Sequence, residues 1–228
     1  MKNRLFSSAI VLVAVLSGCA TPTKMAFQND DERLTATSKP VFLMTATLKN
    51  AYRTSFQPRL LVVNIEKVGA KEAADRLNFT MDEKARNETD SAQTGNSYFL
   101  RLPLDPGRYE IRGLTSMTRT FPIVGTFFAP LHLPIESAGP GVYYLGRVNA
   151  TVRERKDNEF KAGPSIPLLD QAIAGASGGT FDVEITDDFS SDEVSFRSIF
   201  PALAGIEIRK AILPPFDRAK AQQWWEAH

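Results

Sequence analysis

The alternation of hydrophobic and polar residues along most of this chain predicts β-strands. From Val41 onward, short runs of β-branched and aromatic residues are separated by turn-forming residues, and the pattern repeats every two residues. These runs lie at 41–52, 59–67, 77–81, 97–114, 125–135, 141–152 and 180–185. Many short strands with turns between them are typical of a two-sheet antiparallel sandwich, and we assign this domain to residues 41–213.

The runs differ in their expected environment. Residues 41–49 alternate and predict a half-buried strand, whereas 59–67 is nearly all apolar at its centre, as expected for a strand covered on both faces. The run 97–114 alternates on both sides of Asp105-Pro106-Gly107, and these turn residues predict two paired antiparallel strands. The segment 82–97 is charged and rich in turn residues, so we expect an exposed loop.

Helical patterns are confined to the last third of the chain. Ser190 and Glu193 have the spacing of a capping box, which predicts the start of one helix. Asp217 follows Pro214-Pro215 and precedes good helix formers, which predicts a C-terminal helix within 214–228. A long connection, 153–179, separates two of the strands and contains a short helix-like run at 167–176.

The N-terminus has the pattern of a secretory signal over residues 1–18. Lys2 and Arg4 supply positive charge, an apolar region runs from Phe6 to Leu16, and small residues follow. This apolar region is shorter than the roughly 20 residues that a membrane-spanning helix needs. The signal therefore predicts export, with any lasting attachment made in another way.

Leu16-Ser17-Gly18-Cys19 resembles the lipobox of bacterial lipoproteins. The resemblance implies that the sulfur of Cys19 receives a diacylglyceryl group and that acyl chains such as palmitate hold the mature N-terminus in a membrane. Two or three chains anchor a protein almost permanently. Ala20, where an aspartate would retain the protein at the inner membrane, implies the outer membrane, at its periplasmic face or at the cell surface. An ordinary signal peptide with a chance cysteine is the alternative.

Composition and charge narrow the kinds of partner and of stabilisation that can be expected. Residues 19–40 are polar and predict a flexible tether between the lipid and the domain. Without Lys2 and Arg4 the mature chain has 25 basic and 26 acidic residues, and no basic cluster stands out, which argues against a nucleic-acid partner. Cys19 is the single cysteine, so no disulfide can support the fold.

The residues "LPLDPGRYEIRGL" (102–114) and "GVYYLGRV" (141–148) resemble a pair of strands in small bacterial envelope lipoproteins of unassigned function. The domain of those proteins is a prealbumin-like or carboxypeptidase-regulatory-like sandwich, related in architecture to immunoglobulin domains. The segment 184–203 also resembles their strand, acidic turn and helix. The resemblance implies a fold and neither an activity nor a cofactor, and the connection 153–179 departs from it.

Three sequence patterns bear on a possible catalytic or metal site. "GASGG" places Ser177 in a Gly-x-Ser-x-Gly match, but a strand follows it where a hydrolase has a helix, so a serine hydrolase is the alternative rather than the expectation. The acidic residues Asp187, Asp188, Asp192 and Glu193 lack the spacing of a calcium loop. His132 and His228 with one lipid-bearing cysteine form no zinc pattern. We therefore expect no catalytic set, metal or cofactor, and no enzyme.

Aromatic residues offer a candidate partner surface. It comprises Phe121, Phe127 and Phe128 in a proline-rich run, together with Trp224 and Trp225 near the C-terminus. The alternative is that these rings cap the sandwich's own core. The sequence thus predicts a lipid-anchored, non-enzymatic envelope module that binds or scaffolds another envelope protein. A peptidoglycan or carbohydrate binder that uses these aromatic residues is a further alternative.

Overall fold

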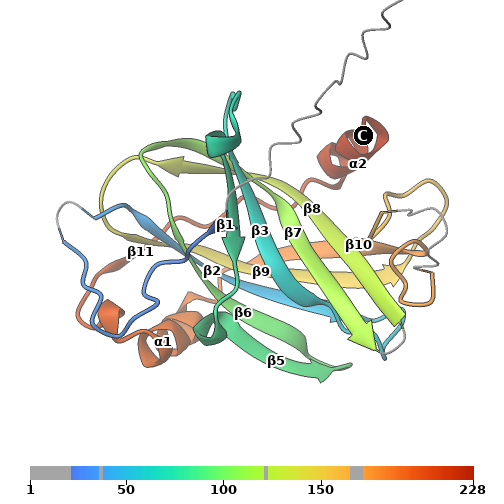
Figure 1. Ribbon diagram of the computed structural model, residues 1–228, viewed down its shortest axis with the longest axis horizontal. Coiled ribbons are helices and arrows are strands. Elements are labelled where there is room, and N and C mark those ends of the chain that lie inside the picture. Colours follow the sequence, from blue (N-terminus) through green and yellow to red (C-terminus); the bar gives the residue numbers. More distant parts are fainter. Residues whose placement is uncertain (1–21, 36–37, 121–122, 165–171) are drawn as a thin grey trace, which may run out of the picture.

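The fold is mainly β. The computed structural model describes residues 22–35, 38–120, 123–164 and 172–228. Two open mixed sheets pack together, and two short α-helices lie near the C-terminus (Figure 1). The predicted mainly-β two-sheet architecture with C-terminal helices is confirmed in this form.

The first sheet has the strand order β1-β4-β3-β7-β8 and the second has the order β10-β9-β2-β6-β5. The strands of the first sheet are β1 (Pro22–Thr23), β4 (Arg76–Thr80), β3 (Arg59–Lys67), β7 (Gly107–Thr120) and β8 (Ile123–Ser137). Those of the second are β10 (Gly179–Thr186), β9 (Val142–Glu154), β2 (Val41–Asn50), β6 (Gly95–Pro103) and β5 (Arg86–Ser91), and β11 (Ile208–Lys210) also pairs with β9.

The expectation of purely antiparallel sheets is wrong. β2 and β9 run parallel, with Val41 beside Val142, and β11 pairs with the same residues of β9 in the same direction. β1 is also parallel to β4. The physical reason is that the chain enters β9 from β8 in the other sheet, so no hairpin turn determines the direction of β9 relative to β2.

The predicted hairpin around Asp105-Pro106-Gly107 is a corner between the two sheets. β6 pairs with β2 and β5, whereas β7 pairs with β3 and β8. Leu102 on one side of the turn and Ile111 on the other are both fully buried in the common core. Alternation predicted both strands correctly, but strands that face each other across a core alternate just as paired strands do.

The predicted exposed loop 82–97 is also wrong in part. It contains the 3₁₀-helix η2 (Glu83–Ala85), the strand β5 and the beginning of β6. β5 lies at the edge of the second sheet and is mostly exposed, so its polar residues meet solvent while its backbone pairs with β6. A polar edge strand has the composition of a loop.

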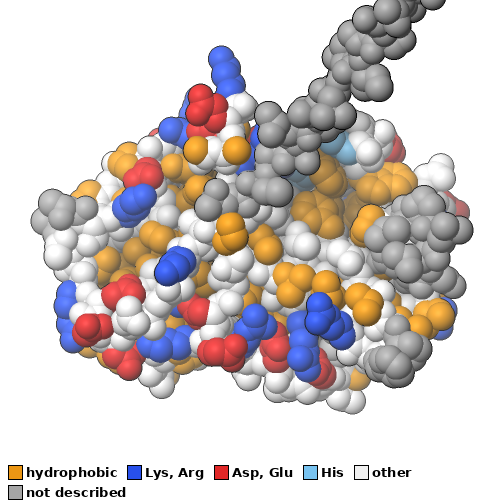
Figure 2. All heavy atoms as spheres, in the orientation of Figure 1, with side chains coloured by type: hydrophobic (Ala, Val, Ile, Leu, Met, Phe, Trp, Pro, Cys, Tyr) orange, Lys and Arg blue, Asp and Glu red, His pale blue; other side chains and the backbone are white. Residues whose placement is uncertain are grey.

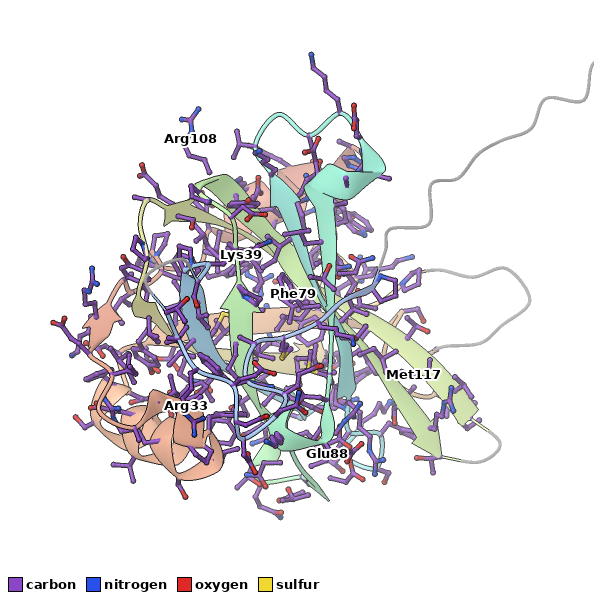
Figure 3. The ribbon with its side chains drawn as sticks, turned by 60° about the vertical axis from the view of Figure 1, so that its left-hand side comes forward. Arg33, Lys39, Phe79, Glu88, Arg108 and Met117 are labelled. Carbon is purple, nitrogen blue, oxygen red and sulfur yellow. The ribbon has the colours of Figure 1, made fainter. Side chains whose placement is uncertain are left out.

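The core has two parts. The larger lies between the sheets and includes Phe42, Phe79 and Leu114 (Phe79 is labelled in Figure 3). The smaller lies on the outer face of the second sheet, where Leu43 packs with Phe196 of α1 (Phe189–Ile199). The first six residues of β2 are therefore buried on both faces, while β3 alternates between buried and partly exposed positions. The sequence predicted the reverse, because it did not show which strand the helix covers.

The N-terminal segment 22–35, which we call the strap, packs on the sandwich. The sequence predicted a flexible tether over 19–40, and the described part of that range differs, since Met25 and Phe27 are each only 3% exposed. The guanidinium of Arg101, itself fully buried, donates to the carbonyl of Ala26 at 3.0 Å and to Asp82 at 2.5 Å. This polar segment stays bound because the buried guanidinium of Arg101 depends on the carbonyl of Ala26 as a hydrogen-bond acceptor.

Two further bonds complete the environment of Arg101. Its guanidinium donates to the carbonyl of Phe99 at 3.0 Å and to the sulfur of Met25 at 3.4 Å. It also lies 4.2 Å from the ring centre of Phe200. The strap thus closes over a charged side chain whose hydrogen-bonding capacity is nearly exhausted.

The helix starts test the capping predictions. α2 (Arg218–Glu226) begins after Asp217, whose carboxylate accepts from the backbone N–H of Lys220 at 3.0 Å, so that prediction is confirmed. The capping box of Ser190 and Glu193 is wrong. α1 begins two residues earlier, with Asp188 as the residue before the helix, and Glu193 binds Arg197 one turn further along instead.

Candidate functional site

A β-bulge in β8 creates the centre of the candidate site. Gly113 of β7 pairs with Pro130 and Ile111 pairs with Leu133, so Arg112 faces two residues, Leu131 and His132. His132 has a φ of 52°, an uncommon left-handed conformation for a residue other than glycine. β8 tolerates its prolines because it is the edge strand of its sheet. The bulge turns the imidazole inward, leaving the side chain 3% exposed.

The buried His132 pairs with the partly exposed Glu110 on the neighbouring strand. Its Nδ1 lies 2.7 Å from Oε1 of Glu110. Lys220 on α2 approaches the same carboxylate oxygen to 3.3 Å and donates to the carbonyl of His132 at 2.8 Å. The pair therefore links β7, β8 and α2.

The charges of this pair follow from burial and hydrogen bonding. Burial lowers the pKa of His132, although its bond to Glu110 acts in the opposite direction. Burial acts to raise the pKa of Glu110, but the bonds from His132 and Lys220 outweigh it, and that pKa falls below its ordinary value. An ionised Glu110 accepts the proton of Nδ1, so Nε2 of the neutral ring is left as an acceptor. Nε2 is buried and has no partner among the described residues.

Trp224 covers His132 from the C-terminal helix. The ring centres of Trp224 and His132 are 5.1 Å apart, and His228 stacks on Trp224 at 5.0 Å with an interplanar angle of 24°. Phe128 of β8 lies 5.3 Å from the same indole. The indole Nε1 is buried and, within the described part of the chain, it donates to no acceptor. Contacts between rings, together with the hydrogen bond from Lys220 to the carbonyl of His132, therefore hold α2 to β8.

A groove runs beside this cluster, and we call it the α2–β8 groove. Its volume is about 580 Å³, within the range of small-molecule and side-chain pockets. Its walls come from β7, β8, the connection after β9 and the C-terminal segment. They are Thr115, Thr126, Phe127, Phe128, Pro130, Lys161, Gly163, Pro164, Trp224, Trp225 and His228. Hydrophobic side chains gather around α2 beside a histidine in Figure 2. The walls combine aromatic surface with a few polar groups, which suits an apolar group that carries a polar end.

The structure brings three residues of the predicted partner surface together at the groove and buries a fourth. Phe128, Trp224 and Trp225 are half-buried and line the groove. Phe127 borders it but is fully buried, and its ring meets Phe181 in the core. Phe121 lies outside the described residues. His132, which pairs with Glu110 beside the groove, was not among the candidate surface residues that the sequence indicated. The prolines around it were the only available signal of an irregular strand.

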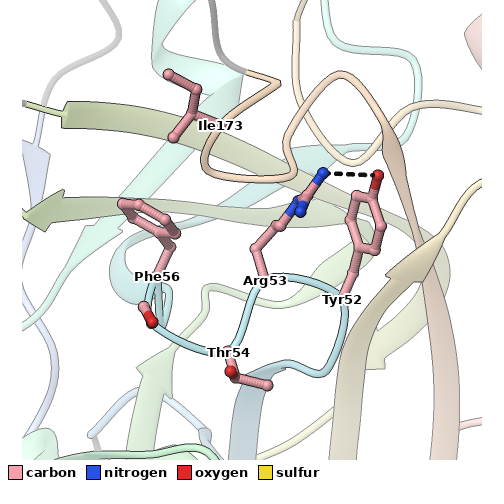
Figure 4. Close-up of a pocket in the computed structure, with 6 residues that line it drawn as sticks. Tyr52, Arg53, Thr54, Phe56 and Ile173 are labelled. Atoms are coloured by element: carbon pink, nitrogen blue, oxygen red, sulfur yellow. Dashed lines mark hydrogen bonds between the residues drawn. The ribbon is translucent and has the colours of Figure 1, made fainter.

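A second, more open hollow lies where β2 leads into β3. Tyr52 to Phe56 form one side and Ile173 the other, with a volume of about 470 Å³ (Figure 4). Arg53 stacks over the ring of Tyr52 at 4.6 Å and donates to its hydroxyl at 3.3 Å. It gathers none of the predicted site residues.

Ser177 lies in a turn that leads directly into β10, so the local order is turn and strand rather than strand, turn and helix. His132 is bound to Glu110, and His228 is bound to the carbonyl of Trp224. Neither histidine is hydrogen-bonded to Ser177 where the chain is described. The arrangement lacks the strained strand-to-helix turn on which a nucleophile elbow depends.

The acidic residues near α1 fasten the helix to the second sheet. Asp192 is fully buried, accepts from the hydroxyl of Tyr144 at 2.6 Å and pairs with Arg147. Burial and this carboxylate raise the pKa of Tyr144. Asp187 binds Lys210 at 2.8 Å. In the described ranges, no three histidine, cysteine or carboxylate side chains converge as metal ligands.

Cys19 lies outside the described residues. Within those residues, no helix has the length and apolar character needed to cross a membrane. The chain matches no known protein family, and comparisons with curated proteins and with solved structures give no match either.

Proposed function

We propose that this chain is a lipid-anchored protein of the bacterial cell envelope that binds an apolar segment of another envelope component in the α2–β8 groove. In this proposal the protein is held at the outer membrane by Cys19 and catalyses no reaction. Its sandwich is of the prealbumin-like type that the strand motifs resemble. The lipobox-like sequence Leu16–Cys19 supports the anchor.

The observation that carries the binding role is the composition of the groove. Half-buried aromatic rings of α2 and β8 line a concave surface of about 580 Å³. Aromatic side chains in such positions supply much of the binding energy at protein interfaces, because they bury large apolar areas with few rotatable bonds. The near-neutral charge of the mature chain gives no reason to expect a strongly charged partner.

Photo-crosslinking in cells tests the binding role. A photoreactive residue replaces His228, which lines the groove, and in a matched control it replaces Val194, which is 69% exposed on α1. We expect a discrete crosslinked partner only from position 228 after gentle solubilisation of membranes. Recovery of the monomer alone from both positions would count against the proposal, whereas capture of peptidoglycan fragments would favour the sugar-binding alternative.

Fractionation tests the anchor separately. The wild type is expected to partition with membranes, and the mass of its N-terminal peptide is expected to include a diacylglyceryl group on Cys19. The Cys19→Ser variant should be released as soluble protein. An unmodified N-terminal peptide in membrane-bound wild type would contradict the lipid anchor. It would not bear on the proposed binding in the α2–β8 groove.

A further inference from the structure

The position of the strap sets how far the folded body can lie from Cys19. β1 pairs in parallel with β4, with Pro22 beside Asn78 and Thr23 beside Phe79. In a parallel pair the upstream directions of both strands coincide. The chain therefore joins the body from the side on which β4 begins, at Arg76.

The chain between Cys19 and Pro22 is short. An extended chain spans at most 3.3–3.6 Å per residue, so the Cα atoms of these two residues are at most about 11 Å apart. The strap adds no slack, because Met25 and Phe27 are buried and Arg101 holds the carbonyl of Ala26. A lipid on Cys19 would thus keep this edge of the first sheet close to the bilayer.

On the side where the chain joins the body, the connection from β3 to β4 projects from the surface. It comprises residues 67–76, and we call it the β3–β4 tip. It contains the 3₁₀-helix η1 (Ala73–Asp75) and stands out at the top of the body in Figure 1, with basic side chains at its outer end and an acidic one beside them in Figure 2. Asn78 is the pairing partner of Pro22, and Asp75 precedes Asn78 by the same number of residues as Cys19 precedes Pro22. The lipid-bearing residue can therefore reach the tip.

The chemistry of the β3–β4 tip suits a phospholipid surface. Val68 is 56% exposed, and its backbone N–H donates to the carbonyl of Arg108 at 2.9 Å. Arg108 extends away from the body in Figure 3. Lys67 and Lys71 are exposed as well, and no described carboxylate lies within ion-pair distance of either ammonium. Asp75 instead accepts from the backbone N–H groups of residues 71 and 72.

We propose that the β3–β4 tip rests on the surface of the anchoring membrane, with Val68 at the level of the headgroups and Lys67, Lys71 and Arg108 facing lipid phosphates. Exposed basic residues beside an apolar side chain are a common means of contact with anionic lipids. The proposal rests on the proposed lipid anchor. It also orients the molecule, since α1 lies at the opposite end of the view in Figure 1.

Fluorescence quenching by labelled lipids tests this orientation. Lipidated full-length Val68→Cys and Val194→Cys proteins carry one fluorophore each and are reconstituted into vesicles of phosphatidylethanolamine and phosphatidylglycerol that contain a nitroxide-labelled lipid. Position 194 is the control because it is 69% exposed on α1. We expect several-fold stronger quenching at position 68 than at position 194. Insertion of a long Gly/Ser segment between Thr21 and Pro22 should remove most of that difference while the protein still sediments with the vesicles.

The outcomes separate this proposal from the anchor on which it rests. Equal quenching at both positions, in protein that carries one fluorophore and sediments with vesicles, would overturn the contact of the tip and leave the anchor intact. Two fluorophores per chain would mean that Cys19 is a free thiol, so the anchor itself would fail and the orientation with it. Shielding of position 68 from a soluble quencher without quenching by lipid would indicate a protein neighbour and would also overturn the proposal.

Discussion

The two terminal segments of the described chain, the strap and α2, are attached to the sandwich in contrasting ways. The strap closes over Arg101, whose guanidinium is fully buried and donates four hydrogen bonds. α2 is attached through the ring of Trp224, which meets His132 and Phe128, and through hydrogen bonds at its partly exposed side, such as that from Lys220 to the carbonyl of His132. Beneath α2, Nε2 of His132 and Nε1 of Trp224 are buried without a partner among the described residues.

This contrast separates a structural attachment from an adaptable one. A buried charge whose bonds are all made becomes very costly if one partner leaves, so the strap stays in place. A buried polar atom without a partner costs about 1–3 kcal/mol, so the docked position of α2 is less stable than its aromatic contacts alone would make it. An element held in this way can shift when a ligand enters the groove beside it, which fits the proposed binding role of the α2–β8 groove.

The largest effect is expected from breaking the attachment of the strap. Arg101→Met leaves the carboxylate of Asp82 and the carbonyl of Ala26 without their donor. Removal of one partner of a buried ion pair costs about 3–5 kcal/mol. Equilibrium unfolding in urea should show a loss of this size, and limited proteolysis should cut within 22–40. Arg33→Met is the control, because this exposed guanidinium binds two nearby strap carbonyls, those of Asp30 and Glu32. Equal destabilisation by both variants would refute the role of Arg101.

A smaller loss is expected from breaking the attachment of α2. Trp224→Ala removes the ring contacts to Phe128 and His132, but the indole is only half-buried. We expect a loss of about 2 kcal/mol, below the 3–5 kcal/mol of a fully buried tryptophan. Thermal unfolding measures it, and Val194→Ala, at an exposed position of α1, is the control. Release of α2 without loss of the sandwich should appear as faster amide exchange confined to 217–228. Exchange that rises equally throughout both sheets would argue against separate attachment.

A pH dependence sharpens the contrast further. The pKa of His132 is lowered by burial in the folded protein, so between that value and about 6.5 the unfolded chain binds the proton and the folded chain does not. Stability should therefore fall as the pH drops below about 6.5. The nearby charges are Glu110 and Arg112 on β7, Lys220 on α2 and the stacked His228.

Urea unfolding at about pH 7.5 and about pH 5.5 measures this effect. His132→Gln should remove most of the difference, since an amide does not titrate. His228→Gln is the matched control and should retain the difference, because it leaves His132 and its bond to Glu110 in place. An unchanged pH dependence in His132→Gln would assign the effect to another group.

The smallest effect is expected at the salt bridges beside the start of α2. Glu159 accepts from Arg153 at 2.6 Å and pairs with Arg218 at 3.3 Å, and the bond from Arg153 is the main cause that lowers the pKa of Glu159 to about 2. Its contribution is therefore complete above about pH 4.5 and is lost as the pH falls toward about 2. Glu159→Gln should cost about 0.5 kcal/mol at neutral pH, as exposed networks do. Exposed Glu154→Gln is the control, and a matching loss there would contradict the specific role of Glu159.

Local patterns in the sequence were sufficient for some elements. The period of two predicted most strands, because alternate side chains along a strand meet opposite environments. Asp217 predicted the start of α2, because a helix leaves its first N–H groups for a nearby side chain to accept. The tryptophans of that helix were identified as candidate surface residues from their type and position alone.

Long-range contacts decided the rest. Only the packing of α1 determined that β2 is covered on both faces, and only the strand order showed that the turn at Asp105-Pro106-Gly107 joins two sheets. The polar composition of the strap predicted a tether. The strap is bound instead because the buried guanidinium of Arg101, far from it in sequence, holds the carbonyl of Ala26. The bulge that turns His132 toward Glu110 also needs β7 opposite β8. Alternation along the chain indicates which side chains of a strand are buried. It does not indicate what they pack against, because the packing partners are distant in sequence and meet only when the chain folds.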